Sequence, residues 1–209
     1  SSLSGSLTLP NGITSIGEYA FYECSGLNGS LVLPGGMTSI GKSAFSICKG
    51  IRRVTIRYGM KAIPDYAFAD CESLRSVSIS DSVTEIGKGA FSDCPVLQSM
   101  ELPISVTSIG ESAFEGCDNL ERLVIPESVT SIGKDAIRFV GYVCGYSGSA
   151  IQSYCAKNNI EFIALDKQVK VSLDAAGGKV NTSYIMVEAF CRYGMLPVTE
   201  RYGYKFTGW

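Results

Sequence analysis

The sequence predicts a β-rich α/β solenoid of about six stacked coils, closed by a helix–strand segment and followed by a small second β domain. Two observations predict it. One residue pattern returns every 23 residues after a first step of 24, and each copy contains a short alternation of apolar and polar residues. A repeat of this length is typical of solenoids. Because one coil cannot bury its apolar face alone, successive coils must stack on one another.

Three columns of residues keep this period. The first is an Ile followed by Gly or Pro, at Ile16, Ile40, Ile63, Ile86, Ile109 and Ile132. Five residues later come Phe21, Phe45, Phe68, Phe91 and Phe114, with Ile137 in the sixth copy. Three residues further on are Cys24, Cys48, Cys71, Cys94 and Cys117. Chance does not keep so many positions in register.

Each copy also predicts one short strand with an apolar and a polar face. The apolar pairs are Leu7/Leu9, Leu31/Leu33, Val54/Ile56, Val77/Ile79, Met100/Leu102 and Leu123/Ile125. A proline ends four of these strands, where it cannot continue the ladder. The Thr-Ser-Ile-Gly segment then turns the chain, and Gly-x-x-Ala-Phe is expected to form one short helical or 3₁₀ turn. At a strand spacing of ~4.8 Å the stack is roughly 25–30 Å long.

Residues 141–165 break the period. Ser147 or Ser149 is expected to cap a helix that runs to about Lys157 and ends at Asn158–Asn159. The apolar strand 160–163 follows. A solenoid needs such a C-terminal cap, because the last coil otherwise exposes its core and a free strand edge.

The repeat resembles a known family. The stretch Ile125-Pro-Glu-Ser-Val-Thr-Ser-Ile-Gly133, with Gly-x-x-Ala-Phe-x-x-Cys after it in other copies, resembles the BspA-type leucine-rich repeat. The resemblance covers residues 1–165, including the cap at about 141–165, and implies a leucine-rich-repeat stack. It also implies a secreted or cell-surface protein of bacteria or protists that binds host proteins or other cells.

Residues 166–209 are expected to form a second domain. Residues 169–173 and 184–188 alternate as strands around a Gly177–Gly178 turn. The segments 174–178, 193–197 and 203–209 resemble the Listeria–Bacteroides repeat, of the InlB B-repeat type. That resemblance implies a small, incomplete β-grasp-like domain and strengthens the surface assignment. The segment departs from the repeat at 188–190 and at Cys191.

The composition argues against catalysis. The chain has no histidine, which excludes a Ser-His-Asp triad and a Cys-His dyad and removes the commonest metal ligand. The carboxylates at Asp65, Asp70, Asp81, Asp93, Glu101, Glu111, Glu115 and Asp118 are scattered with no marked pair, so solubility of the outer face explains them. The net charge is −2 without long charged runs, which indicates neither nucleic acid nor an anionic membrane. We expect a monomer without cofactor, metal or transmembrane segment.

The sequence predicts structural roles for the cysteines and glycines. The cysteine column is expected to be buried and to pack as small apolar thiols, since its spacing is not that of a zinc site. A Cys144–Cys155 disulfide in the cap is the alternative for those two residues, and Cys191 is expected to be unpaired. The glycines Gly141, Gly145 and Gly148 match no phosphate-binding motif, so tight turns explain them.

The exposed positions of the strands are the candidate binding site. They form two expected rows, Ser6, Ser30, Arg53, Ser76, Ser99 and Arg122, and Thr8, Val32, Thr55, Ser78, Glu101 and Val124. The third coil departs most from the repeat, with Arg52, Arg53, Arg57, Tyr58 and Lys61 where other coils have mostly Ser, Thr or Pro. Arg and Tyr are favoured at binding hot spots, although drift on a solvated face gives the same pattern. The predicted partner-binding residues are Arg53, Thr55, Arg57, Tyr58, Ser78, Glu101 and Arg122.

These observations predict a non-catalytic recognition or adhesion module that binds an extracellular protein or glycan through the exposed strand rows. The alternative is a structural spacer that holds other domains away from the cell envelope. An enzyme would need a cleft with converging carboxylates, and six small coils offer little concavity.

Overall fold

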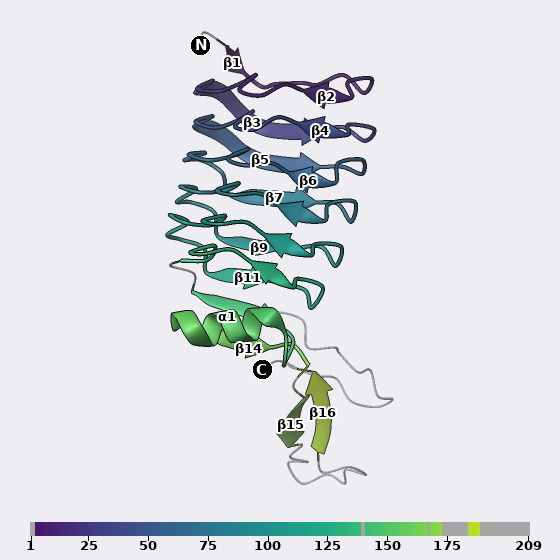
Figure 1. Ribbon diagram of the computed structural model, residues 1–209, viewed down its shortest axis with the longest axis vertical. Coiled ribbons are helices and arrows are strands. Elements are labelled where there is room, and N and C mark those ends of the chain that lie inside the picture. The colour runs from purple at the N-terminus through teal and green to yellow at the C-terminus, as the bar shows by residue number, and fades with distance from the viewer. Residues whose placement is uncertain (1–2, 139–140, 167, 173–183, 189–209) are drawn as a thin grey trace, which may run out of the picture.

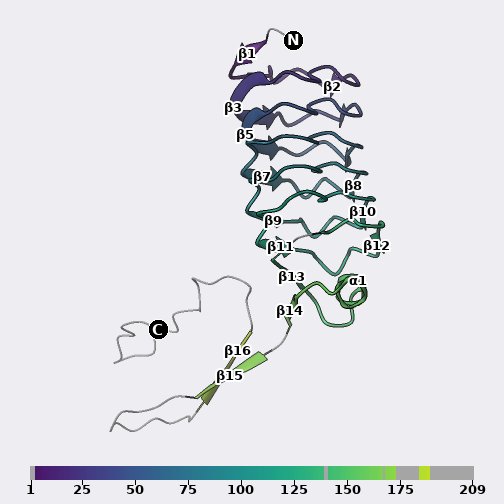
Figure 2. The ribbon, with the colours of Figure 1, turned by 90° about the vertical axis from the view of Figure 1, so that its left-hand side faces the viewer.

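The computed structural model describes residues 3–138, 141–166, 168–172 and 184–188. The chain winds into a stack of coils that is seen from the side in Figure 1. Each repeat coil places one short strand in each of two columns, and Figure 2 shows these columns along opposite edges of the stack. The predicted solenoid is therefore confirmed.

The first column contains the strands predicted from the apolar–polar alternation. They are β1 (Ser4–Gly5), β3 (Gly26–Leu33), β5 (Gly50–Ile56), β7 (Ser76–Ile79), β9 (Ser99–Glu101), β11 (Arg122–Val124), β13 (Tyr142–Gly145) and β14 (Phe162–Ala164). They are parallel in two ladders, β1-β3-β5-β7 and β9-β11-β13-β14. One strand differs from the prediction. Leu7 and Leu9 pack half-buried against the core instead of forming the first strand, which is β1.

The second column consists of two-residue strands around the repeated isoleucine. They are β2 (Ser15–Ile16), β4 (Ser39–Ile40), β6 (Ala62–Ile63), β8 (Glu85–Ile86), β10 (Ser108–Ile109) and β12 (Ser131–Ile132). Equivalent residues lie opposite each other, for example Ile63 and Ile86, which are fully buried. The period of 23 residues is therefore the length of one coil.

The expected helical turn at Gly-x-x-Ala-Phe is wrong. In the second coil, Ser43 and Ile47 have left-handed backbone conformations, with φ of 53° and 61°. The N–H groups of Ser43, Phe45 and Ile47 donate to carbonyl oxygens of the next coil at 3.0, 3.0 and 2.8 Å. The residues between them donate to the carbonyl three residues earlier in their own coil. A helix would use these N–H donors internally and leave adjacent coils without hydrogen bonds between them. The segment therefore forms turns that are hydrogen-bonded to the next coil instead of a helix.

A column of phenylalanine rings fills the core. The ring centroids of Phe21 and Phe45 are 5.0 Å apart, and the next three steps, to Phe68, Phe91 and Phe114, are 5.7 Å each. Neighbouring rings are within 9° of parallel. Ile137 continues the column in the sixth coil, where it is bridged to Phe114.

The predicted helix is confirmed as α1 (Ala150–Asn158), which lies at the foot of the stack in Figure 1. Ser149 is its N-cap residue, but the Ser149 hydroxyl donates to the Tyr146 carbonyl instead of capping the helix. The helix ends at Asn159, which adopts the left-handed conformation that closes many helices. Its buried residues, Ile151 and Cys155, join the core of the coils.

Beyond the coils the structure describes one antiparallel strand pair, β15 (Gln168–Ser172) and β16 (Tyr184–Glu188). Both strands were predicted from their alternation. The other segments that resemble the Listeria–Bacteroides repeat, 174–178, 193–197 and 203–209, lie outside the described residues, as does Cys191.

Candidate functional site

The outward positions of the first column form a continuous surface, here called the strand face. It consists of Ser30, Val32, Arg52, Arg53, Thr55, Arg75, Ser76, Ser78, Ser99, Glu101 and Arg122. The ladder aligns Ser30 with Arg53 and Ser76 in one row, and Val32 with Thr55 and Ser78 in the next. The first column, and with it this face, runs along the left edge of the stack in Figure 2.

Five of the seven predicted binding residues lie on the strand face: Arg53, Thr55, Ser78, Glu101 and Arg122. Arg57 continues the alternation one residue beyond β5, where its N–H donates to the Leu33 carbonyl at 3.2 Å. Tyr58 does not lie on this face. It belongs to the turn after β5, and 71% of its surface is exposed.

Arg122 is fixed within the fold. Only 20% of its side chain is exposed, and one guanidinium nitrogen lies 3.9 Å from a carboxylate oxygen of Glu101 on the neighbouring strand. The two residues are diagonal neighbours, since Arg122 lies opposite Ser99. Its Nε is buried without a hydrogen-bond partner among the described residues. Arg122 therefore contributes to packing between strands more than to an accessible surface.

Val124 was expected to be exposed, and this is wrong. It is 9% exposed and packs with Cys144, Tyr142, Ile163 and Leu165. The outward residues of β13 and β14 are apolar, unlike those of the repeat strands, so they extend the apolar packing onto β11. The polar strand face therefore ends at Arg122.

The row that contains Arg52 and Arg75 was not among the two rows predicted from the sequence, although Arg52 was named in the cluster of the third coil. Pairing between β3 and β5 shifts by one residue after Gly29, which leaves Arg52 as the extra residue of a β-bulge. Arg52 and Arg53 are both exposed, as are Arg75 and Ser76 at the equivalent positions of the next coil, and the Arg75 N–H donates to the Arg52 carbonyl at 2.9 Å. The signal was the spacing of Ile51 and Val54, which leaves two successive outward positions between buried residues.

A second surface lies at the loops that follow the first-column strands. Ile104 is 79% exposed in the loop after β9, two repeats after Tyr58. An open hollow of ≈ 660 Å³ lies beside it, lined by Ile104, Pro126, Glu127, Ser128, Tyr146, Ser147, Gly148 and Ser149. The signal for this surface was an isoleucine after Pro103, where most other coils have a polar residue or glycine.

The predicted column of buried thiols is confirmed. Cys48, Cys71, Cys94 and Cys117 are free and buried, and each thiol donates to the carbonyl of a phenylalanine in the preceding coil at 3.1–3.4 Å. Burial raises the pKa of Cys48 to about 12, and burial also raises that of Cys71. Cys155 is a free thiol as well, so the alternative Cys144–Cys155 disulfide is wrong.

These thiols are expected to be unreactive in the folded chain. With a pKa of about 12, the reactive thiolate of Cys48 is a fraction of ~10⁻⁴ at pH 8. Alkylation of Cys48 by iodoacetamide should therefore be about a thousandfold slower in the folded chain than in guanidinium, as followed by mass spectrometry of its peptide. Equal rates in the two conditions would contradict a buried, protonated column.

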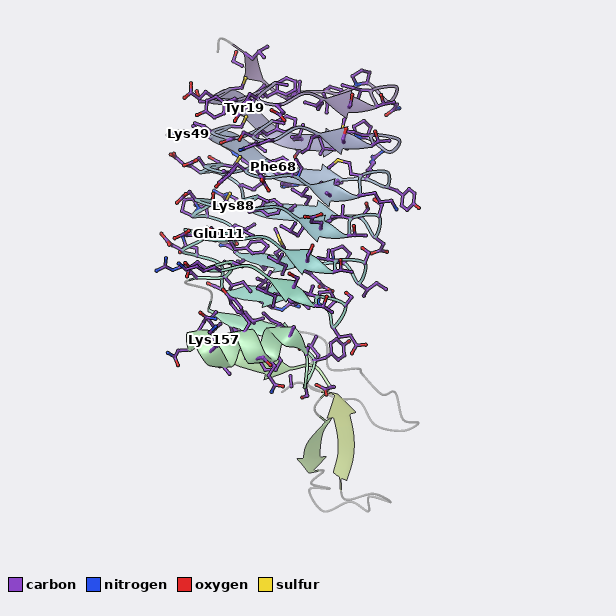
Figure 3. All side chains as sticks on the ribbon, viewed as in Figure 1. Tyr19, Lys49, Phe68, Lys88, Glu111 and Lys157 are labelled. Carbon is purple, nitrogen blue, oxygen red and sulfur yellow. The ribbon has the colours of Figure 1, made fainter. Side chains whose placement is uncertain are left out.

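Some charged side chains on the turn side of the coils form ion pairs with the neighbouring coil. Lys49 pairs with Glu72 at 2.7 Å and Lys88 with Glu111 at 3.1 Å, along one edge of Figure 3. Burial and nearby carboxylates raise the pKa of Asp93.

Within the described ranges, no group of three or more His, Cys, Asp or Glu residues is arranged to hold a metal ion.

Solved structures share this fold. A leucine-rich repeat protein from Bacteroides ovatus is 30% identical, with a TM-score of 0.69 over 79% of this chain and 44% of that one. The pneumococcal vaccine antigen PcpA is 19% identical, with a TM-score of 0.60 over 76% and 41% of the two chains. The T. pallidum leucine-rich repeat protein is 23% identical, with a TM-score of 0.56 over 76% and 85%. This chain thus spans less than half of the first two.

The repeat itself matches a family model. No curated protein matches the chain. The model described as the BspA type leucine-rich repeat region matches in six copies over residues 2–97 and 42–143. That match covers the coils whose columns, strands and turns are described above. The chain therefore belongs to the BspA-type leucine-rich-repeat family.

Proposed function

We propose that the chain is a non-catalytic recognition or adhesion module of a bacterial surface or secreted protein. It binds an extracellular protein or glycan through the strand face. The observation that carries this proposal is the continuous polar surface over the five strands β3, β5, β7, β9 and β11, set against a core that buries the repeated apolar residues. Solenoids use such extended surfaces to bind partners.

One further finding supports a location outside the cell. The chain belongs to the BspA-type family, whose members are typically secreted or attached to the cell surface. In the part of the chain that the structure describes, no helix is long and apolar enough to cross a membrane.

The same proposal includes the domain organisation. Residues 1–165 form the binding domain, in which residues 141–165 act as the C-terminal cap that shields the core of the last coil. Residues 166–209 belong to a separate B-repeat-like β domain. The buried positions of Ile151 and Cys155 in α1 support the capping role.

Binding of the purified chain to a panel of extracellular matrix proteins and glycans tests the proposal. We expect saturable binding to at least one member of the panel by the folded chain, and none by the chain held in denaturant. A folded chain that binds no member contradicts recognition by this segment. The spacer is then the better account, and cross-coil hydrogen bonds along the whole stack suit that role too.

A further inference from the structure

We propose that the ligand of the strand face is an anionic polysaccharide, held by an arginine cluster on β5 and at the start of β7. This inference rests on the proposed function and adds the chemical class of the ligand. The cluster, here called the arginine cluster, consists of Arg52, Arg53, Arg57 and Arg75.

Three of these side chains start from neighbouring positions. Arg52 and Arg53 are consecutive and both exposed, and Arg75 and Ser76 are both exposed at the equivalent positions of the next coil. Arg75 lies beside Arg52, because the Arg75 N–H donates to the Arg52 carbonyl at 2.9 Å. Adjacent strands are ~4.8 Å apart, so three guanidinium groups start from neighbouring backbone positions.

Among the described residues, no member of the arginine cluster forms an ion pair with a carboxylate. The ion pairs there are Lys49–Glu72, Lys88–Glu111, Arg122–Glu101, Lys134–Asp135 and Arg138–Glu115. None of them includes a member of the cluster. Asp81 and Glu85, on the next coil, are exposed and likewise form none of these pairs. Four cations on two adjacent coils thus remain available to an anion.

The surroundings of the cluster suit a sugar polymer better than a protein. The neighbouring side chains Ser30, Thr55, Ser76 and Ser78 carry hydroxyl groups, which match the hydroxyl groups of a glycan. A protein interface instead centres on buried apolar anchors, and Val32 is the large apolar side chain that the strand face exposes. Tyr58 lies beyond the end of β5, where its exposed ring offers a flat surface to a sugar ring.

The spacing of the charges suits a linear polyanion. Arg53 and Arg57 are four residues apart along one strand, which is roughly 13 Å. The guanidinium group binds the sulfate or carboxylate groups of such a polymer through paired hydrogen bonds. No single deep pocket is needed, because each charge contributes along the length of the polymer.

Dextran sulfate, uncharged dextran and poly-glutamate are the probes, with binding measured by calorimetry on the full chain. We expect binding to dextran sulfate that weakens at least about tenfold between about 50 and 200 mM NaCl, and no binding to uncharged dextran. The variant Arg52→Glu/Arg53→Glu/Arg75→Glu should lose about 100-fold or more in affinity. Its circular dichroism and melting temperature verify that it folds.

The control Lys42→Glu/Lys134→Glu/Lys157→Glu makes the same change in net charge at exposed residues outside the strand face. It should keep most of the affinity. Equal losses in both variants would overturn the inference, since binding would then follow net charge alone. Equal or tighter binding of poly-glutamate would also overturn it, in favour of an acidic protein ligand.

Different results would contradict the polysaccharide inference and the recognition function. If a panel protein binds with an affinity that salt and the arginine changes leave unaltered, while dextran sulfate does not bind, the polysaccharide inference fails and the recognition function stands. If the folded chain binds neither dextran sulfate nor any panel member, both fail.

Discussion

Replacement of Phe68 with alanine is expected to lower the free energy of unfolding by about 3–5 kcal/mol. Phe68 is fully buried, and its ring stacks between those of Phe45 and Phe91 at 5.7 Å on either side. Removal of the ring loses the burial of an aromatic side chain and leaves a cavity in the middle of the column. The rigid backbone bonds between coils prevent the neighbouring coils from closing it.

Guanidinium unfolding followed by circular dichroism measures this change. The control is Tyr58→Ala, which removes an aromatic ring that is 71% exposed and should change the free energy by less than about 0.5 kcal/mol. A loss below about 1 kcal/mol for Phe68→Ala would show that the stacked column does not hold the coils together.

The second large effect is expected at Gly110, which follows the repeated isoleucine of the fifth coil. A Cβ there would lie 2.5 Å from the Lys88 nitrogen and 2.6 Å from the Gly87 carbonyl carbon, both backbone atoms of the preceding coil. Gly110→Ala should therefore separate the two coils and cost about 2–3 kcal/mol or more. The melting temperature and the unfolding midpoint measure it.

Gly17 gives a matched control, because it has the same place in the first coil. A Cβ at Gly17 has no atom within 4 Å, so Gly17→Ala should leave the stability nearly unchanged. Equal destabilisation at the two positions would mean that close approach of the coils is not the cause. Pro64 has this place in the third coil, and nothing in the structure explains why a non-glycine residue is accepted there.

The repeat made much of the fold predictable. Columns of stacked residues such as Phe45–Phe68–Phe91 can be predicted without knowing any contacts, because a constant period places equivalent residues above one another. The helix α1 was predictable from local signals, a serine before it and Asn159 after it, and these act within a few residues.

The turn segments were not predictable from local patterns. Ser43 and Ile47 adopt left-handed conformations that their residue types do not favour, least of all the β-branched Ile47. Hydrogen bonds to the next coil stabilise these conformations, and such bonds exist only in the stacked state. A sequence segment read alone favours the helical turn instead.

The sequence predicted only part of the candidate site. The reason is related, since the remaining features depend on pairing between strands. Strict alternation places Arg53, Thr55 and Ser78 correctly on the strand face. It does not foresee the bulge at Arg52, since a bulge depends on the pairing with β3. Nor does it foresee that Arg122 is fixed by Glu101, since that contact depends on the diagonal pairing of two strands.

Recognition through the strand face is tested most directly by the affinity of two charge-matched variants for the first ligand that the panel identifies. Ser76→Glu/Ser78→Glu places two carboxylates on the strand face, and Ser39→Glu/Ser131→Glu places two at exposed positions of the second column. We predict a loss of at least about tenfold for the first variant and unchanged affinity for the second. Unchanged affinity of Ser76→Glu/Ser78→Glu, with a loss in Ser39→Glu/Ser131→Glu, would place the site on the other column and contradict the account.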